Sequence, residues 1–184
     1  KDGSLKILEQ YSDKIKIISK SNGGTASALN TGIRNMNGHW FKWLSADDLL
    51  YPTAIEDLVN VAEKLKNKEN TIFYSNYDII DSNGNIIEQF IEPDYNNLDQ
   101  FEFNIILLDH YIGNGTTSLI HKSALDRYGL FDETIGFQED YELWMRYCIQ
   151  YNCRLYVISK ILAKYRFHQN QLTSKKIGES LKNA

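Results

Sequence analysis

The fold is decided by the stretch Trp43-Leu44-Ser45-Ala46-Asp47-Asp48-Leu49-Leu50-Tyr51-Pro52. The apolar run 39–44 overlaps its start and predicts a buried strand, and a helix is expected at 53–66. Two adjacent carboxylates lie between the predicted strand and the predicted helix. In α/β sheets, ligands bind at the carboxyl ends of the strands. Such a pair is costly unless a positive group meets it, and a divalent metal carrying a phosphorylated ligand would do so. Alternatively, Asp47 or Asp48 caps the helix that begins near Pro52.

Length and composition predict one globular domain. The chain has 184 residues, 42% of them hydrophobic, which is enough for a sizeable core. Its formal net charge is -4, and no basic block indicates a nucleic-acid partner. The apolar runs are too short to cross a bilayer. Cys148 and Cys153 are expected to be free thiols of a reducing compartment. The twelve tyrosines and three tryptophans favour an aromatic core over a surface that stacks on sugars or bases.

Alternating strand and helix patterns predict an α/β sheet that is parallel at first and mixed later. Strands are expected at 14–19, 40–44, 71–80, 86–91, 116–121, 154–159 and 161–167. Helices are expected at 5–11, 25–36, 53–66, 98–108, 122–128 and 139–151. The strands 71–80 and 86–91 flank a turn sequence and predict a β-hairpin.

Five motifs that carry polar chemistry follow one another along the chain. They are Asp2-Gly3-Ser4, the segment 22–33 that begins Asn22-Gly23-Gly24, the pair Asp47-Asp48, the pair Glu139-Asp140, and Tyr165-Arg166-Phe167-His168. This ordered set resembles glycosyltransferase family two, whose members have the GT-A fold. The resemblance extends from Asp2 to about Thr173, which is nearly the whole chain.

The resemblance implies a Rossmann-like GT-A fold: an α/β, mainly parallel mixed sheet flanked by helices and carrying a β-hairpin. Residues 1–91 would form the half that binds the nucleotide sugar and the metal. Residues 92–184 would form the half that holds the acceptor and the catalytic base. Members of the family have a strand and a helix ahead of the position of Asp2, so the chain is expected to be a fragment that binds donor weakly.

The implied activity is transfer of a sugar from a nucleotide-diphosphate sugar to a hydroxyl group, with inversion. The implied acceptor is a glycan or a lipid-linked glycan, and the implied context is bacterial surface polysaccharide synthesis. We therefore expect a cytoplasmic protein, at the inner face of the plasma membrane or peripherally associated with it, and no nucleic-acid partner.

A divalent metal, Mn²⁺ or Mg²⁺, is the implied cofactor. By resemblance, Asp47 is the direct ligand, and Asp48 supports it or contacts the sugar. His168 would be a second ligand, and imidazole suits Mn²⁺ better than Mg²⁺. The alternative for His168 is a surface side chain beside Gln169 and Asn170. The metal would neutralise the negative charge that builds up on the leaving diphosphate.

Asp140 is the implied general base, with Glu139 beside it as a second catalytic carboxylate that raises its pKa. Such a base takes the proton from the acceptor hydroxyl as that oxygen attacks the sugar. The alternative is a helix that begins with acidic residues because its dipole favours them. Trp144 and Arg146 are expected to pack and pair behind this site, and 113–117 either lines the acceptor side or is a plain turn.

Six residues are implied to bind the donor: Asp2, Asn22, Gly23, Asn30, Ser45 and Asp48. The chain departs from the usual family pattern at two positions. Ser45 stands where an aspartate is common, and Leu29 stands where an arginine often faces the diphosphate. Lys20 or Arg34 would have to replace that arginine.

Two other functions are consistent with parts of the sequence. One is a non-catalytic relative that binds a nucleotide or a carbohydrate, but the presence of Asp47, Asp140 and His168 together favours an enzyme. The other is a different nucleotide enzyme on a Rossmann-like sheet. The chain contains neither the Gly-x-Gly-x-x-Gly of dehydrogenases nor the Gly-x-x-x-x-Gly-Lys-Ser/Thr of P-loop enzymes.

Overall fold

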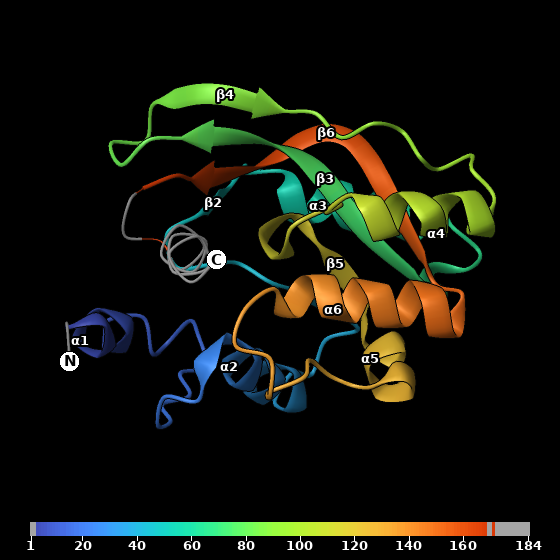
Figure 1. The fold of residues 1–184 in the computed structure, drawn as a ribbon. Helices are drawn as coiled ribbons and strands as arrows, with labels where there is room; N and C mark the ends of the chain where they lie inside the picture. Colours follow the sequence, from blue (N-terminus) through green and yellow to red (C-terminus); the bar gives the residue numbers. More distant parts are fainter. Residues whose placement is uncertain (1–2, 169–170, 172–184) are drawn as a thin grey trace, which may run out of the picture.

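The computed structural model describes residues 3–168 and residue 171. Within this part, six strands form one sheet in the order β1-β5-β3-β6-β2, and β4 pairs with the free part of β3 (Figure 1). The strands are β1 (Trp40–Lys42), β2 (Leu49–Leu50), β3 (Thr71–Ile80), β4 (Ile86–Phe90), β5 (Leu119–His121) and β6 (Arg154–Arg166).

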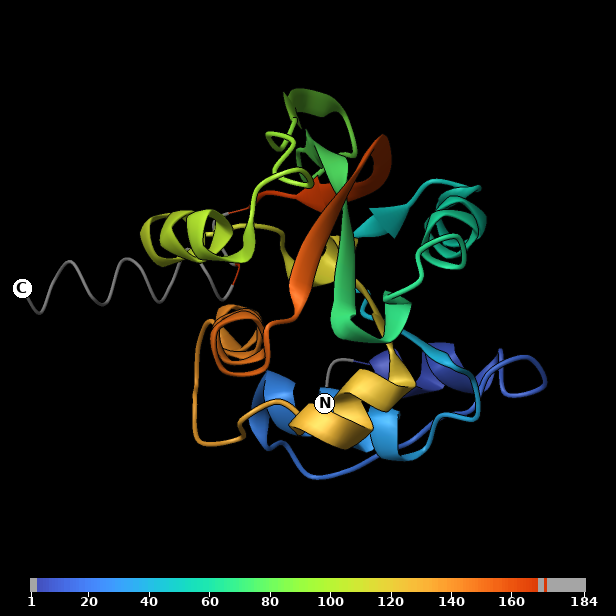
Figure 2. The same cartoon turned by 90° about the vertical axis from the view of Figure 1, so that its right-hand side faces the viewer.

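Helices cover both faces of this sheet. They are α1 (Ser4–Glu9), α2 (Gly24–Arg34), α3 (Ala54–Ala62), α4 (Gln100–Asp109), α5 (Lys122–Tyr128) and α6 (Glu139–Met145). Three short helices complete the described part: η1 (Lys68–Asn70), η2 (Gly115–Thr117) and η3 (Arg146–Gln150), the last of which continues α6 as a π-helix. Figure 2 shows β3 and β6 side by side, with α3 on one side of the sheet and α4 on the other.

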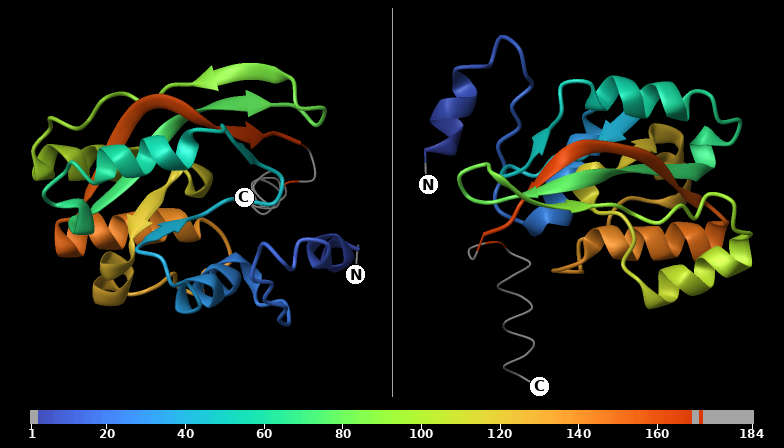
Figure 3. Two further views of the ribbon diagram at one scale, coloured as in Figure 1. Left: turned by 180° about the vertical axis from the view of Figure 1, so that it is seen from behind. Right: turned by 90° about the horizontal axis from the view of Figure 1, so that it is seen from above.

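Alternation along β3 builds the two halves of the core, because successive strand side chains point to opposite faces. Ile72 and Tyr74 pack into the cluster under α2, α4, α5 and α6, whereas Phe73 packs into the cluster under α3. The helix α1 contains no buried residue and projects away from the sheet in both views of Figure 3. The architecture is therefore an α/β/α sandwich, which confirms the expected fold class.

The sheet is less parallel than the sequence pattern predicts. Of the five pairings, β3 with β6 is parallel, and those of β1 with β5, β5 with β3, β2 with β6 and β4 with β3 are antiparallel. The strand β5 inserts between β1 and β3 in the opposite direction. Such an insertion depends on which distant segments pair, and the local periodicity of a segment does not contain that information.

The strand expected at 14–19 is not formed. Residues 11–14 form turns, and 16–20 have no regular structure. A strand is stable only when a neighbour satisfies its backbone groups, and no described strand pairs with this segment. Its alternating pattern therefore does not lead to sheet formation here, and Ile15 and Ile18 remain exposed.

The predicted hairpin is confirmed: β3 and β4 pair around the turn 81–85. The prediction of two strands within 154–167 is wrong, because one continuous strand, β6, forms there with irregular register against β3. The helix expected at 98–108 is α4, which begins with a capping box of Asp99 and Glu102. Both cysteines are buried free thiols. No helix in the described residues is long and apolar enough to cross a membrane.

Candidate active site

A cavity of about 430 Å³ opens where the β1–β2 loop, η2 and the start of α6 meet. The loop contributes Ser45, Asp47 and Asp48, and the start of α6 contributes Glu139 and Asp140. The remaining lining residues described are Thr25, Trp43, Tyr77, Tyr111, Asn114, Gly115, Thr116, Phe137, Gln138, Tyr165 and Gln171. The structure thus brings five of the predicted site residues together, although the two acidic pairs lie far apart in the sequence.

Asp48 is the buried member of the first pair, 5% exposed. Its Oδ2 accepts a hydrogen bond from the Thr116 hydroxyl, and its Oδ1 accepts one from the Arg166 backbone N–H at 2.8 Å. Burial raises the pKa of Asp48, and these two hydrogen bonds oppose that rise. The side chain therefore ties the loop after β1 to η2 and to the end of β6.

Asp47 is the accessible member of that pair. Its side chain is 39% exposed, and its Oδ2 lies 3.2 Å from Nε2 of His168. Its backbone carbonyl accepts a hydrogen bond from Arg166 Nε at 2.8 Å, which holds the main chain in place. Neither carboxylate caps α3, whose N-cap residue is Thr53 and which has no side-chain capping hydrogen bond. The capping interpretation of this pair is therefore wrong.

Asp140 is the buried centre of the second pair, 8% exposed. Its Oδ2 accepts hydrogen bonds from the Tyr111 hydroxyl and from the Gly115 N–H, the latter at 3.1 Å. Its Oδ1 accepts one from the Tyr141 N–H at 2.9 Å. Burial raises the pKa of Asp140, and the three donors favour its ionised form. The cause of the rise is burial and not the neighbouring Glu139 that the sequence suggested.

The short helix η2 joins the two acidic pairs. Consecutive residues hold one carboxylate each: Gly115 donates to Asp140 and Thr116 donates to Asp48. Gly115 lies against the Trp43 ring so closely that a Cβ there would overlap it. The segment 113–117, which the sequence left open between an acceptor wall and a plain turn, is therefore a wall of the cavity that also positions both carboxylates.

Lys42 holds η2 through a hydrogen bond to its backbone. Its Nζ donates to the backbone carbonyls of Trp43, at 2.7 Å, and of Thr116. Burial lowers the pKa of Lys42 to about 7, and the nearby Asp48 carboxylate opposes that decrease. The Lys42 side chain thus links the end of β1 directly to the backbone of η2.

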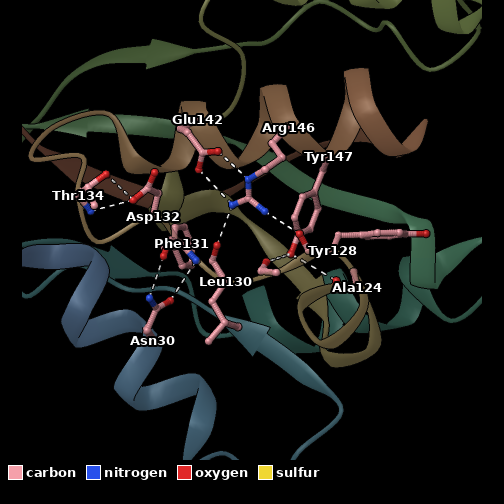
Figure 4. A network of polar contacts seen from close by, with 11 residues as sticks. Asn30, Ala124, Tyr128, Leu130, Phe131, Asp132, Thr134, Glu142, Arg146 and Tyr147 are labelled. Carbon is pink, nitrogen blue, oxygen red and sulfur yellow. Dashed lines mark hydrogen bonds and ion pairs between the residues drawn. The ribbon is translucent and has the colours of Figure 1, made fainter.

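Other predicted donor-binding residues lie outside the cavity lining. Asn30 is 1% exposed and holds a segment 101 residues away: its Oδ1 accepts from the Phe131 N–H and its Nδ2 donates to the Phe131 carbonyl (Figure 4). The side-chain oxygen of Asn22 accepts a hydrogen bond from the Gly24 N–H at the start of α2, and Gly23 is the residue between them. A donor contact by these residues stays a prediction. Asp2 lies outside the described residues.

The residues expected behind the site do pack and pair there. Arg146 forms an ion pair with Glu142, with Nε 2.6 Å from Oε1, and donates to the carbonyls of Tyr128 and Leu130 (Figure 4). Trp144 is 1% exposed, and its indole N–H donates to the Gly113 carbonyl at 3.3 Å. Trp144 thus holds α6 against the segment that leads into η2, and Arg146 holds the continuation of that helix against the end of α5 and the residues after it.

The cavity is also lined by aromatic and hydroxyl side chains, most of which are not predicted as lining residues from the sequence. The aromatic lining residues are Trp43, Tyr77, Tyr111, Phe137 and Tyr165. The high tyrosine content was a signal for them, but it did not separate lining residues from core residues such as Tyr74 and Tyr147. Gln138, in the left-handed region at φ 60°, also lines the cavity, and non-glycine residues with that backbone conformation are uncommon.

None of the described lining residues is a lysine or an arginine. The two candidates for a diphosphate contact are engaged elsewhere: Lys20 donates to the Ser27 hydroxyl at 2.6 Å, and Arg34 lies 3.6 Å from Glu133. The guanidinium of Arg166 donates to the carbonyls of Asp47 and Asp81. The cavity wall is therefore acidic, with four carboxylates.

Residues 1–129 match the family model described as glycosyl transferase family 2. The chain belongs to this family. An uncharacterised glycosyltransferase of Rickettsia typhi is 38% identical over 175 residues, which are 95% of this chain and 54% of that protein. WfgD of Escherichia coli, named as a UDP-Glc:alpha-D-GlcNAc-diphosphoundecaprenol beta-1,3-glucosyltransferase, is 29% identical over 95% of this chain and 64% of its own length.

Solved glycosyltransferase structures have the same fold. S. aureus TarS 1-349 in complex with UDP-GlcNAc superposes with a TM-score of 0.69 at 18% identity, over 94% of this chain and 48% of that one. The chain spans between 24% and 54% of the length of five similar Rickettsia glycosyltransferases. The family match ends before Glu139, so the place of Asp140 and His168 in the site rests on the geometry described above.

Proposed function

We propose that this family 2 chain transfers a sugar from a uridine-diphosphate sugar to a hydroxyl group of a glycan or lipid-linked acceptor in bacterial surface glycan synthesis. The observation that carries the proposal is the meeting of two acidic pairs, Asp47–Asp48 and Glu139–Asp140, in one cavity. One pair is suited to holding a metal-bound diphosphate, and the other to removing a proton. Both tasks are needed in one place for sugar transfer.

The acidic wall favours a metal-dependent donor site. Four carboxylates with no lysine or arginine among the described lining residues would repel a diphosphate unless a cation bound with it. Asp47 and His168 present a carboxylate oxygen and an imidazole nitrogen 3.2 Å apart, a donor set that suits Mn²⁺. The described residues contain no cluster of three such ligands. Phosphate oxygens and water would therefore complete the coordination, as is common for such ions.

When bound, the metal would neutralise the charge on the leaving diphosphate. In the transfer itself, the acceptor oxygen forms a bond to the anomeric carbon while the bond from that carbon to the diphosphate oxygen breaks. The electron pair of the broken bond stays with the diphosphate, and the hydroxyl proton passes to Asp140. A single displacement of this kind inverts the anomeric centre. The three donors on Asp140 favour its ionised form, which is the form that a base requires.

The relatives support the choice of donor and acceptor. Two structures of S. aureus TarS 1-349 are complexes with UDP and with UDP-GlcNAc. The name of WfgD gives UDP-glucose as its donor and a diphosphoundecaprenol-linked sugar as its acceptor. A uridine nucleotide is therefore the first donor class to test, and a lipid-linked sugar the first acceptor class.

Isothermal titration calorimetry with UDP, UDP-glucose and UDP-GlcNAc tests the donor site, each with and without Mn²⁺. We expect binding that requires Mn²⁺ and that is lost in Asp47→Ala, because that change removes the accessible carboxylate. Asp126→Ala is the matched control, since Asp126 makes an exposed ion pair with Lys122 on α5, away from the cavity. Metal-independent binding, or binding that Asp47→Ala retains, would contradict the proposal.

A further inference from the structure

The carboxylate proposed as the base is held by a tyrosine that the sequence does not single out. Tyr111 follows α4 and lines the cavity, and its hydroxyl donates to Oδ2 of Asp140. The Gly115 N–H donates to the same oxygen at 3.1 Å. A carboxylate oxygen has about two acceptor sites, so Oδ2 is fully used within the protein. Its orientation is set by one side chain and one backbone group.

Tyr111 is 46% exposed and packs on one side against Tyr141 of α6. The two ring centroids lie 5.6 Å apart, and the Tyr141 hydroxyl donates to the Leu107 carbonyl at 2.7 Å. That contact anchors the last turn of α4, from which Tyr111 follows. Burial of the hydroxyl and the nearby Asp140 carboxylate raise the pKa of Tyr111 above its ordinary value. The hydroxyl therefore stays protonated and can donate a hydrogen bond.

We propose, on the basis of the function proposed above, that Tyr111 is a positioning residue for sugar transfer. Its hydroxyl orients the Asp140 carboxylate through Oδ2. Oδ1 accepts one hydrogen bond, from the Tyr141 N–H, and its remaining acceptor site is the one that receives the acceptor proton. The phenol ring of Tyr111 packs beside the Tyr141 ring, which favours this position of the hydroxyl. The role of Tyr111 is thus exerted through Asp140 and not through direct contact with the reacting atoms.

The hydroxyl also affects ionisation, because a hydrogen bond to the charged form of a carboxyl favours that form. The Tyr111 hydrogen bond lowers the pKa of Asp140 against the opposing effect of burial. The other titratable side chains that line this cavity are Asp47, Asp48, Glu139, Tyr77 and Tyr165. They are unchanged by a substitution at Tyr111, so the difference between variant and wild type reports the loss of one donor.

The test is Tyr111→Phe, which removes the hydroxyl and keeps the ring. We expect kcat for UDP release from a UDP-sugar in the presence of acceptor to fall about 10-fold to 100-fold with little change in donor KM. The acid limb of the pH profile should move to higher pH, because Asp140 becomes harder to ionise. Tyr128→Phe is the matched control: its hydroxyl donates to Asn70 Oδ1 at 2.8 Å, outside the cavity.

Carbon-13 NMR of chain labelled at the aspartate carboxyl carbon gives a readout that needs no substrate. The Asp140 signal is assigned by its loss in Asp140→Asn, and it should titrate at higher pH in Tyr111→Phe than in wild type or Tyr128→Phe. An unchanged titration, or an unchanged pH profile and kcat, would overturn the role of Tyr111 alone. Full activity of Asp140→Asn would instead overturn the proposed base, which separates the two failures.

Discussion

The two acidic pairs of the cavity are alike in sequence and different in structure. In Asp47–Asp48, the second carboxylate is buried and hydrogen-bonded, and the first is 39% exposed beside His168. In Glu139–Asp140, the second carboxylate is again buried, but three donors surround it. The first pair therefore presents an accessible carboxylate, Asp47, whereas both carboxylates of the second pair are buried.

This difference shows how adjacent carboxylates can divide their tasks. Burial and hydrogen-bond donors decide the properties of each side chain, and all the donors described here except the Tyr141 N–H come from residues distant in sequence. The helix η2 supplies a donor to each pair, through Gly115 and Thr116. Substitutions at Asp140, at Gly115 of η2 and at Lys42 change one carboxylate, the helix that contacts both pairs, and the lysine that holds that helix.

The largest expected effect separates the pairs by function. Asp140→Asn should lower kcat by about 10²–10⁴-fold, the usual contribution of a general base, while Mn²⁺-dependent UDP binding remains near wild type. Binding and transfer are measured on the same preparation, by calorimetry and by UDP release. Loss of UDP binding in this variant would mean that the two pairs act as one site and do not divide their tasks.

The second prediction breaks the link. Gly115→Ala places a Cβ where the Trp43 ring lies, so η2 must shift and both carboxylates lose a donor in its native position. We expect a loss of about 1–3 kcal/mol in the free energy of unfolding, with reduced UDP binding and reduced transfer. The measurement is urea unfolding together with both activity assays.

Gly32→Ala is the matched control for that change. Gly32 lies inside α2 with no atom within 4 Å of its would-be Cβ, so alanine should stabilise the helix by about 0.5–1 kcal/mol. If Gly115→Ala were as stable and active as Gly32→Ala, η2 would not be the element that positions the carboxylates.

The smallest effect at neutral pH concerns the support beneath η2. Lys42→Met removes the donor to the Thr116 carbonyl. We expect the free energy of unfolding at pH 7 to fall by about 1 kcal/mol. The pKa of Lys42 is about 7 in the fold against 10.5 for a free side chain. Between these values the unfolded chain binds more protons, so wild-type stability gains with rising pH.

Lys42→Met lacks that gain, so the stability difference between wild type and variant should grow as the pH rises from 7 toward 10. Chemical unfolding at several pH values measures it, and titration of other groups cancels in the difference. A difference that stays flat across this range would show that Lys42 is not perturbed by burial beneath η2.

The sequence predicts the fold best where patterns are local. The hairpin of β3 and β4 and the helix that begins at Glu139 follow from short-range periodicity and turn residues. The strand expected at 14–19 does not form, because pairing depends on a neighbour that periodicity cannot show. The largely antiparallel pairing has the same origin, since β5 enters the sheet from a distant segment.

The sequence predicts the acidic centres of the site but not what holds them. Asp47, Asp48 and Asp140 are visible as motifs, and they share one cavity. Their donors are not visible, because Thr116 lies 68 residues from Asp48, and Tyr111 lies 29 residues from Asp140. The buried position of Asn30, which holds Phe131, also depends on such a long-range contact.

The most direct test of the central claim is a crystal structure with UDP and Mn²⁺, using anomalous scattering to locate the manganese. The division of tasks predicts one manganese peak within coordination distance of the Asp47 carboxylate and of the UDP diphosphate, with Asp140 free of metal. A manganese ion on Glu139 or Asp140, or UDP bound in the cavity with no metal beside Asp47, would contradict it.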